Sequence, residues 1–373
     1  MKHVVHLTSV HDPFDTRIFI KECKSLRVNG YEVTLIVPCD KDEIIDGIIL
    51  RSVPIPKSRL ERMTRTAFQI YRRAKKEKAD IYHFHDPELI PWGLALKLAG
   101  KTVIYDVHED FPRQIMDKHW LRTWVRKPIS ILAGVVEFLA GIILDGIIAA
   151  TPTIKKRFSK NKTILVQNFP ITIELLNENP TSFKERKPYV IYVGGISITR
   201  GIKEMVDAIA LLPDEARLIL GGNFESDDIE NMVKKLPGWS KVDYRGWVSR
   251  TEYRSLLSQC VAGLVLFHPI GNHINAQPNK LFEYMSAGLP VIASDFPLWR
   301  EFIEKNKCGL LVNPFDSNEI MTAIRWILNH PEEAELMGKH GQQAVLSIYN
   351  WSNEEKKLLQ YYAEVLNGCK STN

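Results

Sequence analysis

The sequence predicts an α/β protein with two Rossmann-like, doubly wound parallel-sheet domains. Short β-branched runs alternate with helical periodicity through most of the chain, as in βαβ units. The 373 residues are more than one hydrophobic core usually serves. The alternation is interrupted once, where asparagine and proline cluster between residues 168 and 188.

The expected strands divide into two similar series. In the first half they are His3–Leu7, Glu32–Val37, Ile48–Val53, Asp80–His83, Thr102–Asp106, Gly146–Ala150 and Thr163–Gln167. In the second half they are Tyr189–Val193, Arg217–Leu220, Val242–Arg245, Gly263–Phe267, Val291–Ala293 and Gly309–Val312. After Phe315 the pattern is helical. We therefore expect an N-terminal domain at 1–172, a C-terminal domain at 173–350, and a final helix at 351–373 that packs back on the first domain.

Composition indicates a cytoplasmic globular protein. The chain is 45% hydrophobic and 25% charged, and its five cysteines are scattered without a C-x-x-C pair, which is typical of reduced, intracellular proteins. The first apolar run already contains His3 and His6, so it predicts a buried strand rather than a signal peptide. The most apolar stretch, 128–150, is interrupted by Glu137 and Asp145 and is not expected to span a membrane.

Charge is distributed unevenly along the chain. Residues 1–170 carry 28 Lys and Arg against 19 Asp and Glu, whereas the remaining residues carry 21 against 25. A basic first domain indicates an anionic partner, and we expect a membrane surface, with the protein peripheral on the inner membrane face. The helix Leu60–Lys76, which has one apolar face and one basic face, is the expected membrane contact. The alternative is that its basic face is simply solvated. The apolar residues are Leu60, Met63, Ala67, Ile70 and Ala74, and the basic ones are Arg62, Arg65, Arg72 and Lys76. A second basic and aromatic segment comprises Arg113, Lys118, Trp120, Arg122, Trp124, Arg126 and Lys127.

The segment Tyr189–Lys203 predicts a phosphate site. A buried strand runs into Gly194 and Gly195, and a helix begins near Arg200. Glycine lets the backbone approach a phosphate, and a helix N-terminus offers free N–H groups to it. The Arg200 guanidinium can add a bidentate contact to phosphate oxygens.

The segment Asn275–Ser294 is more specific. Pro278 is expected at the first position of a short helix, which Gly288 ends before the next strand. Glu283 then lies on that helix between apolar neighbours, where a carboxylate suits two adjacent ribose hydroxyls.

The run Lys280-Leu-Phe-Glu-Tyr-Met-Ser-Ala-Gly-Leu-Pro-Val-Ile-Ala-Ser294 resembles the donor-site signature of family-4 glycosyltransferases, which have the GT-B fold. The resemblance extends over essentially the whole chain. It implies that Glu283 binds the nucleotide ribose, that Arg200 binds the diphosphate, and that Trp247 and Val248 flank the nucleobase. The implied donor-binding set is Gly194, Gly195, Arg200, Gly222, Trp247, Val248, Asn275, Ala276, Gln277, Pro278, Asn279, Lys280 and Glu283.

Two positions depart from the family pattern. Asn275 stands where the family usually has a first glutamate near the transferred sugar, and Gly195 stands where many members have an arginine. Lys280, one turn before Glu283, is placed to replace the lost positive charge.

The first domain supplies His108 after a strand, at a position where the family often has a histidine near the transferring sugar. We assign catalytic roles to His108, Arg200 and Lys280, with a structural strand-end histidine as the alternative for His108. Asp15, Arg17, His85 and Glu109 are expected on the acceptor side. For the loop after the first strand, Asp15 or Thr16 can instead act as the N-cap of a helix Arg17–Val28.

The resulting hypothesis is metal-independent, retaining transfer of a sugar from a UDP- or GDP-sugar to a glycan or lipid-linked acceptor in cell-envelope or exopolysaccharide biosynthesis. No cofactor, metal or nucleic acid is expected. Three alternatives stay open: a nucleotide-sugar epimerase or hydrolase using Glu109 and Asp110, a non-catalytic nucleotide-sugar-binding partner, and a metallohydrolase. The metallohydrolase would use His83, His85, Asp86 and His108.

Overall fold

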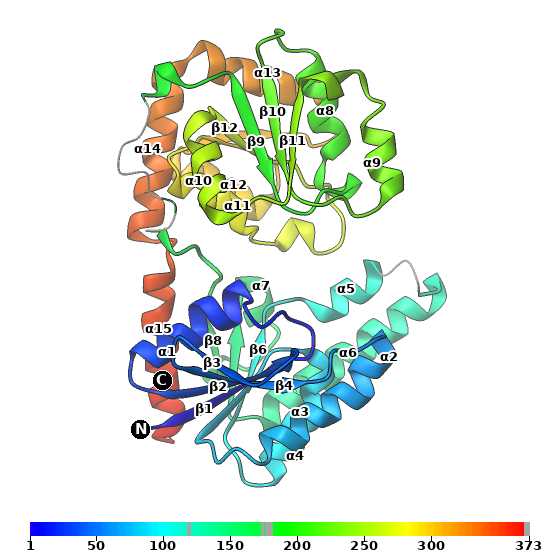
Figure 1. Cartoon of the computed structure of the whole chain (residues 1–373), viewed down its shortest axis with the longest axis vertical. Helices are drawn as coiled ribbons and strands as arrows, with labels where there is room; N and C mark the ends of the chain where they lie inside the picture. The colour runs from blue at the N-terminus through cyan, green and yellow to red at the C-terminus, as the bar shows by residue number, and fades with distance from the viewer. Residues whose placement is uncertain (118–120, 173–174, 176–181, 369–373) are drawn as a thin grey trace. The chain divides into compact units, whose positions relative to one another are not determined.

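The structure is a computed structural model that describes residues 1–117, 121–172, 175 and 182–368. Its contacts divide the chain into two compact units (Figure 1). Unit 1 comprises Met1–Asn168 and Trp351–Asn373, and unit 2 comprises Phe169–Asn350. The sequence boundaries at 172/173 and 350/351 lie close to these divisions. Trp120 and Lys118, part of the predicted basic and aromatic segment, lie outside the described residues.

Unit 1 is built on an eight-stranded sheet in the order β3-β4-β2-β1-β5-β6-β7-β8, parallel except for β3. Its strands are β1 His3–Leu7, β2 Glu32–Pro38, β3 Glu43–Ile45, β4 Ile48–Val53, β5 Ile81–Phe84, β6 Val103–Val107, β7 Gly146–Ala149 and β8 Thr163–Leu165.

Unit 2 is built on a six-stranded parallel sheet in the order β11-β10-β9-β12-β13-β14. Numbered within the unit, this is the 3-2-1-4-5-6 order of the Rossmann fold, and unit 1 repeats it around β1. The strands are β9 Tyr189–Val193, β10 Arg217–Gly221, β11 Val242–Gly246, β12 Ala262–Val265, β13 Val291–Ser294 and β14 Gly309–Val312. The predicted fold class is confirmed.

Helices connect the strands in both units. Unit 1 has η1 Thr16–Cys23, α1 Lys24–Val28, α2 Arg59–Glu61, η2 Arg62–Thr66, α3 Ala67–Ala74, η3 Pro87–Leu89, α4 Ile90–Leu98, α5 Phe111–Asp117, α6 Thr123–Ile143, α7 Pro152–Lys155, η4 Lys160–Lys162 and α15 Trp351–Leu366. Unit 2 has η6 Phe183–Glu185, η7 Ile198–Arg200, α8 Ile202–Ala210, α9 Asp227–Val233, η8 Pro237–Lys241, α10 Arg250–Gln259, η9 His273–Asn275, α11 Asn279–Ser286, α12 Pro297–Asn306, α13 Ser317–Asn329 and α14 Pro331–Ser347.

Every strand expected from the sequence is present, with ends that differ by at most about two residues. The sequence reasoning missed β3, a three-residue strand joined to β4 by a tight hairpin. Asp46 and Gly47 form its turn, with φ angles of 53° and 76°. An Asp-Gly pair between apolar residues is a hairpin signal, so the information was available.

The C-terminal helix α15 packs on unit 1, beside η1 and β8. Its Tyr361 hydroxyl donates to the Lys162 carbonyl at 2.6 Å and accepts from the Ile147 amide at 3.0 Å. The Trp351 indole donates to Ser25 Oγ at 2.9 Å. Among the described residues, no helix has both the length and the apolar character needed to cross a membrane.

The predicted amphipathic helix at residues 60–76 is only partly as expected. Ala67, Ile70 and Ala74 are buried, but the side chains of Leu60 and Met63 are 74% and 52% exposed. Between α2 and α3 the chain forms the π-helix η2, whose wider turn changes the angular spacing of the side chains and rotates the first turn out of the apolar face.

Candidate active site

Each sheet has a switch point where the strand order reverses, and ligands of open parallel sheets bind at that place. It lies between β9 and β12 in unit 2, and between β1 and β5 in unit 1. Most residues predicted for the site lie in the loops that follow these strands.

Glycine is required at two positions beside β9. Gly194 has a φ of 145°, and a Cβ there would lie 2.7 Å from Lys280 Nζ. Gly222, after β10, has a φ of 122°, and its Cβ would lie 2.0 Å from the carbonyl oxygen of Gly194. Only glycine permits both the conformations and this close packing. The two loops therefore press together and leave backbone, rather than side chains, facing the space beside Arg200.

Two cationic side chains, Arg200 from η7 and Lys280 from α11, approach this loop. Arg200 Nη1 donates to the Gly195 carbonyl at 3.2 Å, and Lys280 Nζ donates to the Tyr192 hydroxyl at 3.1 Å. Both cations lie over the Phe267 ring, at 5.6 Å and 5.2 Å from its centroid. Within the described part of the chain, neither cation forms an ion pair with a carboxylate.

The environment of Lys280 is unfavourable for a charged ammonium, because the residue is only 9% exposed. Burial lowers the pKa of Lys280 to about 7, with the positive charge of Arg200 acting in the same direction and the carboxylate of Glu283 opposing it. Burial also raises the pKa of the Tyr192 phenol to about 12, so this hydroxyl keeps its proton and donates it to the Gly195 carbonyl at 2.7 Å.

A pocket of about 290 Å³ opens beside the glycine loop. It is lined by Gly195, Ile196, Ser197, Thr199, Arg200, Asn223, Glu225 and His273. A phosphate group placed in this pocket would meet the Arg200 guanidinium at the N-terminal end of α8. Anions are stabilised there by free N–H groups and by the helix dipole.

Glu283 lies on α11 with both carboxylate oxygens engaged. Arg250 Nη1 donates to Oε1 at 2.7 Å, and the Tyr253 hydroxyl donates to Oε2 at 3.2 Å. The side chain is 16% exposed. It thus lies at the surface of unit 2 in a fixed orientation, and a carboxylate oxygen retains lone pairs for a ribose hydroxyl.

The rest of the predicted donor segment is half-buried. Asn275 ends η9, the Ala276 carbonyl accepts from Trp299 Nε1 at 2.7 Å, and Gln277 follows. Pro278 is the N-cap of α11 and Asn279 its first residue, one position later than the sequence suggested. Trp247, which follows β11, is 74% exposed. Val248 packs against Gly221 so closely that a Cβ added to Gly221 would lie 2.7 Å from the Val248 side chain.

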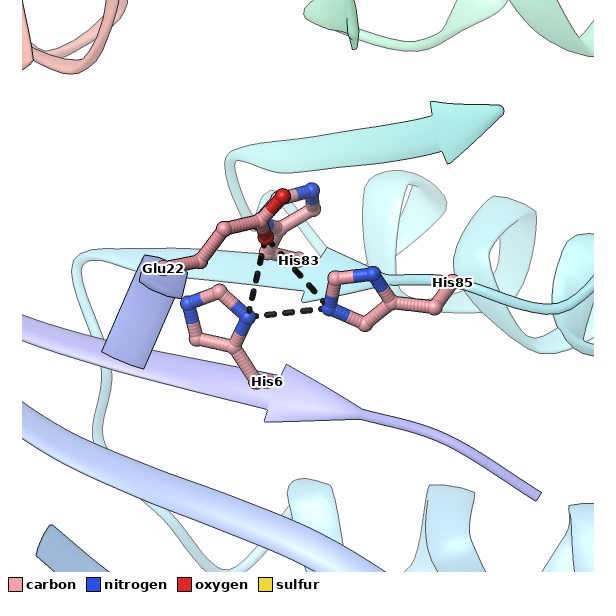
Figure 2. A group of neighbouring side chains, drawn as sticks. All are labelled: His6, Glu22, His83 and His85. Carbon is pink, nitrogen blue, oxygen red and sulfur yellow. Dashed lines mark hydrogen bonds and ion pairs between the residues drawn. The ribbon is translucent and has the colours of Figure 1, made fainter. Parts of the chain in front are cut away.

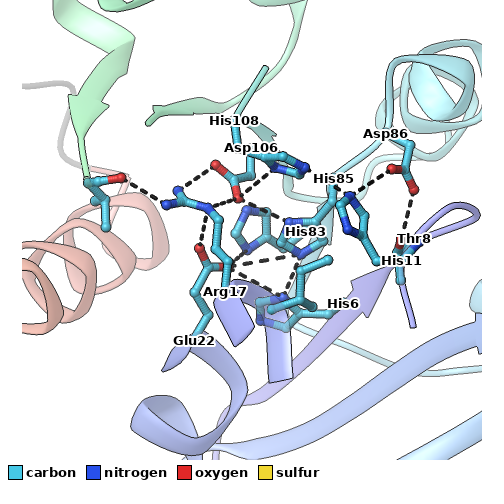
Figure 3. A network of polar contacts seen from close by, with 12 residues as sticks. His6, Thr8, His11, Arg17, Glu22, His83, His85, Asp86, Asp106 and His108 are labelled. Atoms are coloured by element: carbon cyan, nitrogen blue, oxygen red, sulfur yellow. Dashed lines mark hydrogen bonds and ion pairs between the residues drawn. The ribbon is translucent and has the colours of Figure 1, made fainter. Parts of the chain in front are cut away.

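In unit 1, polar side chains meet where β1, β5 and β6 end (Figure 3). His108 Nε2 lies 2.9 Å from His11 Nε2, and His11 also lies 3.4 Å from both Asp15 Oδ2 and Asp86 Oδ1. Burial acts to lower the pKa of His11, but the hydrogen bond to Asp15 and the charge of Asp86 outweigh it and raise that pKa. His108 is partly exposed, at 13%, and stays the candidate of this unit for contact with a sugar.

Two of the residues predicted for the acceptor side, Arg17 and His85, are buried inside unit 1. Arg17 is only 4% exposed; its Nε and Nη2 donate to Asp106 at 2.8 Å each, and its Nη1 donates to the Val166 carbonyl at 3.1 Å. His85 is 2% exposed, with Nδ1 3.1 Å from the same Asp106 carboxylate. Both side chains point inward because the buried carboxylate of Asp106 needs partners, and they supply its hydrogen bonds. They support the loops rather than line a surface.

The other two acceptor-side residues lie nearer the surface. Asp15 accepts from the amides of Arg17 and Ile18 at 2.8 and 2.9 Å, so the N-cap alternative holds for this residue. Glu109 accepts a hydrogen bond from Gln114. Asp110, the other proposed acid or base, is paired with Arg157 at 3.0 Å.

The predicted metallohydrolase set does not come together as one group. Asp86 is not part of either cluster of potential ligands; it accepts from the Thr8 hydroxyl at 2.8 Å and from the Ser9 amide, and it lies 3.4 Å from His11. In the described residues, the potential ligand groups are instead His6, Glu22, His83 and His85, and the smaller set His85, Asp106 and His108.

Sequence reasoning missed several of these residues because their partners are distant in the chain. Arg250 and Tyr253 reach Glu283 from α10, and His11 reaches His108 across the first sheet. The signal for His11 was its place in the loop after the first strand. No local sequence pattern indicated a role for Arg250, because an arginine next to the N-cap Ser249 is typical of a solvent-exposed first turn of a helix.

Two family descriptions match the chain. Residues 176–344 match Glycosyl transferases group 1, and residues 17–165 match Glycosyltransferase Family 4. Among curated proteins, the sulfoquinovosyl transferase SQD2 of Arabidopsis thaliana is 25% identical over 77% of this chain, and the chain spans 58% of that protein's length. The phosphatidyl-myo-inositol mannosyltransferase of Mycobacterium leprae is 20% identical over 91% of this chain and 90% of its own length.

Solved structures share the fold over nearly the whole length. Sucrose-phosphate synthase from Thermosynechococcus elongatus aligns with a TM-score of 0.79 at 19% identity, covering 99% of this chain and 100% of that one. The Anabaena protein HepE in complex with UDP and glucose aligns with a TM-score of 0.75 at 13% identity, covering 98% and 100%.

Proposed function

The chain belongs to the family-4 glycosyltransferases of the GT-B fold, and from this premise we propose that it transfers a glycosyl group from a nucleoside diphosphate sugar to an acceptor hydroxyl. The observation that carries the proposal is the pair of cations, Arg200 and Lys280, beside a glycine loop without a carboxylate partner. Such a site is electrostatically incomplete, and a diphosphate supplies the missing negative charge.

The same pair suits the chemistry of transfer. When the glycosidic bond to the donor breaks, negative charge develops on the departing diphosphate. Cations that are already in place stabilise this charge without having to reorganise. Glu283 orients the ribose, and His108 is proposed to contact the transferring sugar from unit 1. We propose that positive charge from Arg200 and Lys280 makes a metal ion at the diphosphate unnecessary.

UDP is the first nucleotide to test, and GDP the second. Support for UDP comes from HepE, whose solved complexes contain UDP, UDP-glucose, or UDP with glucose. Calorimetry with UDP, GDP, UDP-glucose and GDP-mannose, each with and without EDTA, is the direct experiment. We expect one nucleotide to bind with the same affinity in EDTA. Binding to none of them would refute the transferase proposal, and loss of binding in EDTA would refute metal independence.

Retention at the anomeric carbon is proposed from the family resemblance. Once a donor is known, NMR of the first product formed gives the anomeric configuration directly. The same reaction separates the alternatives: an epimerase or hydrolase changes the donor without an acceptor, and a non-catalytic partner binds the nucleotide without turnover.

For the acceptor we propose a lipid-linked glycan at an anionic membrane, as in cell-envelope or exopolysaccharide biosynthesis. The names of two relatives, phosphatidyl-myo-inositol mannosyltransferase and lipopolysaccharide core biosynthesis glycosyltransferase, involve lipid-bearing molecules. The stronger support is the surface of α6, which leaves a row of large apolar side chains uncovered. These are Trp124, Ile129, Ile131, Leu132, Val135, Val136, Phe138, Leu139, Ile142 and Ile143, each between 39% and 72% exposed.

Basic residues lie near both ends of this helix. Arg122 and Lys127 are exposed in its first turns, and Lys162 Nζ donates to the carbonyls of Ile142 and Leu144 at its end. An apolar face with basic flanks is the pattern of a helix that lies in a membrane interface. We therefore propose α6 as the membrane contact rather than residues 60–76, where Arg62 is paired with Glu88 at 2.7 Å.

Liposome flotation tests this assignment. Anionic vesicles should carry the wild-type protein, and replacing Ile131, Leu132 and Val135 by Ser should abolish flotation. The matched control replaces Arg62, Arg65, Arg72 and Lys76 by Ser, which should weaken flotation only slightly. If the α6 variant still floats, the helix is not the contact. If it becomes monomeric where the wild type is dimeric, the face binds a second copy instead.

A further inference from the structure

Three histidines and a glutamate form a fully enclosed group inside unit 1 (Figure 2). His6, Glu22 and His83 are 0% exposed and His85 is 2% exposed. The parallel register places His6 of β1 directly beside His83 of β5, and the π-type turn η1 brings Glu22 over both strands. One potential ligand atom from each of the four side chains lies within 4.8 Å of the others.

The carboxylate of Glu22 is at the centre of this group. Its Oε2 lies 3.9 Å from His6 Nδ1, 3.9 Å from His83 Nδ1 and 4.0 Å from His85 Nε2. Neither carboxylate oxygen has a hydrogen-bond partner among the described residues, nor has His83 Nε2. Arg17 Nε lies 3.1 Å from Oε1, but it donates its hydrogen bond to Asp106. Buried carboxylate oxygens without a hydrogen bond are rare, and each such group calls for an explanation.

We propose that His6, Glu22, His83 and His85 bind one divalent transition-metal ion, for which zinc is the best match. Zinc bonds of about 2.0–2.1 Å in a tetrahedral site set neighbouring ligand atoms roughly 3.3 Å apart. The shortest separation here is 2.9 Å, between His6 Nδ1 and His85 Nε2, and the longest of those given above is 4.0 Å. Shifts below about 1 Å bring all four atoms to bonding distance, which side-chain rotation can supply.

His85 has the outer contact that a metal-binding histidine requires. His85 Nδ1 is 3.1 Å from Asp106 Oδ2, so its proton is held there and Nε2 presents a lone pair to the group. The Tyr362 hydroxyl lies 2.6 Å from His83 Nδ1 and 3.5 Å from His6 Nε2. When His83 coordinates through Nδ1, this hydroxyl must leave that atom, and the nearby Nε2 of His6 can then take its hydrogen bond. Three imidazoles and a carboxylate are ligands that zinc accepts.

The smaller group, His85 with Asp106 and His108, is the weaker candidate. It offers three ligands, and the Asp106 carboxylate already accepts two hydrogen bonds from Arg17. The four-residue group is also enclosed on every side, so an ion there would be structural: it would tie β1 and β5 to η1, and through Tyr362 to α15. This inference is independent of the proposed transferase activity.

The experiment measures metal content without reference to activity. The tag-free protein is incubated with a small excess of zinc, passed through gel filtration, and analysed by mass spectrometry for metals. We expect about one zinc per chain in the wild type and in the control His3→Gln, whose side chain lies on β1 but outside the group. Glu22→Gln and His83→Gln should retain almost none.

Two measurements on the wild type keep the proposal testable if those variants fold poorly. Zinc added to chelator-treated protein should raise the melting temperature, because a ligand that binds only the folded state stabilises it. Cobalt in place of zinc should give the intense visible bands of a tetrahedral site. Less than about 0.2 zinc per chain, or zinc content with no melting shift on removal, would overturn the proposal. Nucleotide calorimetry on the same samples reports on unit 2, so the two proposals fail separately.

Discussion

We predict that nucleotide binding depends on pH, because the ammonium of Lys280 is buried. At its lowered pKa of about 7, the side chain is half protonated at neutral pH in the free protein. A bound diphosphate adds negative charge beside Nζ and moves this pKa back toward its ordinary value of about 10.5. Binding should therefore take up a proton whenever the free side chain is neutral.

The size of the effect on nucleotide affinity follows from the change in the pKa of Lys280. Returning the pKa of Lys280 from about 7 to its ordinary value of about 10.5 would amount to roughly 5 kcal/mol, which is an upper limit. If only the protonated form binds the diphosphate, affinity falls about tenfold between pH 6 and pH 8, and about a hundredfold by pH 9. Proton uptake should be about 0.1 per nucleotide at pH 6 and about 0.9 at pH 8.

Calorimetry in buffers of different ionisation enthalpy measures this uptake directly. The ligand should be a nucleotide sugar, because its phosphates are diesters and lack the titration near pH 6 of a terminal phosphate. Lys280→Met should bind more weakly and take up no proton. The matched control is Lys203→Met, which removes an exposed lysine that is paired with Asp207. Uptake near zero at pH 8 in the wild type, or equal uptake in Lys280→Met, would refute the assignment of this cation to the diphosphate.

Three further predictions concern the same residues and their supports. Lys280→Met should stabilise the nucleotide-free protein by up to about 4 kcal/mol at pH 7 and about 2 kcal/mol at pH 9 in thermal denaturation. The reason is that the ammonium of Lys280 keeps its proton up to about pH 10.5 in the unfolded chain, so that wild-type stability rises with pH between about pH 7 and pH 10.5. Equal melting temperatures of the two proteins at pH 7 would contradict this prediction. Glu283→Gln should lower nucleotide affinity roughly 10- to 100-fold by calorimetry, whereas Arg250→Gln, which frees one oxygen of that carboxylate, should change it less; the reverse order would mean that Arg250 is the ligand. Arg17→Met should lower the free energy of unfolding by about 3–5 kcal/mol in urea, because Asp106 is left buried without its cation; a loss below about 1 kcal/mol would show that this pair is not needed.

The strands could be predicted because their signal is local. Runs of β-branched residues between turn residues marked both sheets, and the strand order follows from the rules that govern βαβ connections. The three-residue β3 lacked such a run and was missed, although Asp46-Gly47 marked its turn.

The site could be predicted only as far as its motifs reached. The segment around Glu283 is continuous in sequence, so its place after β12 was accessible. The partners of Glu283 were not, because Arg250 and Tyr253 come from another helix. Arg17 was assigned to the acceptor side for a related reason. A lone arginine in a loop suggests a ligand contact, and only the folded structure shows that its guanidinium points inward to Asp106.

The two switch points have the same backbone topology and opposite charge balance, and this difference supports the proposed position of the donor diphosphate. In unit 1 the buried guanidinium of Arg17 is matched by Asp106, whose pKa it holds well below the ordinary value although burial opposes this. In unit 2 Arg200 and Lys280 share the face of one aromatic ring and have no ion-pair partner in the described chain. An uncompensated buried cation lowers the stability of the free protein, and a bound anion would remove this cost. A nucleoside diphosphate brings that charge, and the proton uptake at Lys280 measures whether it does.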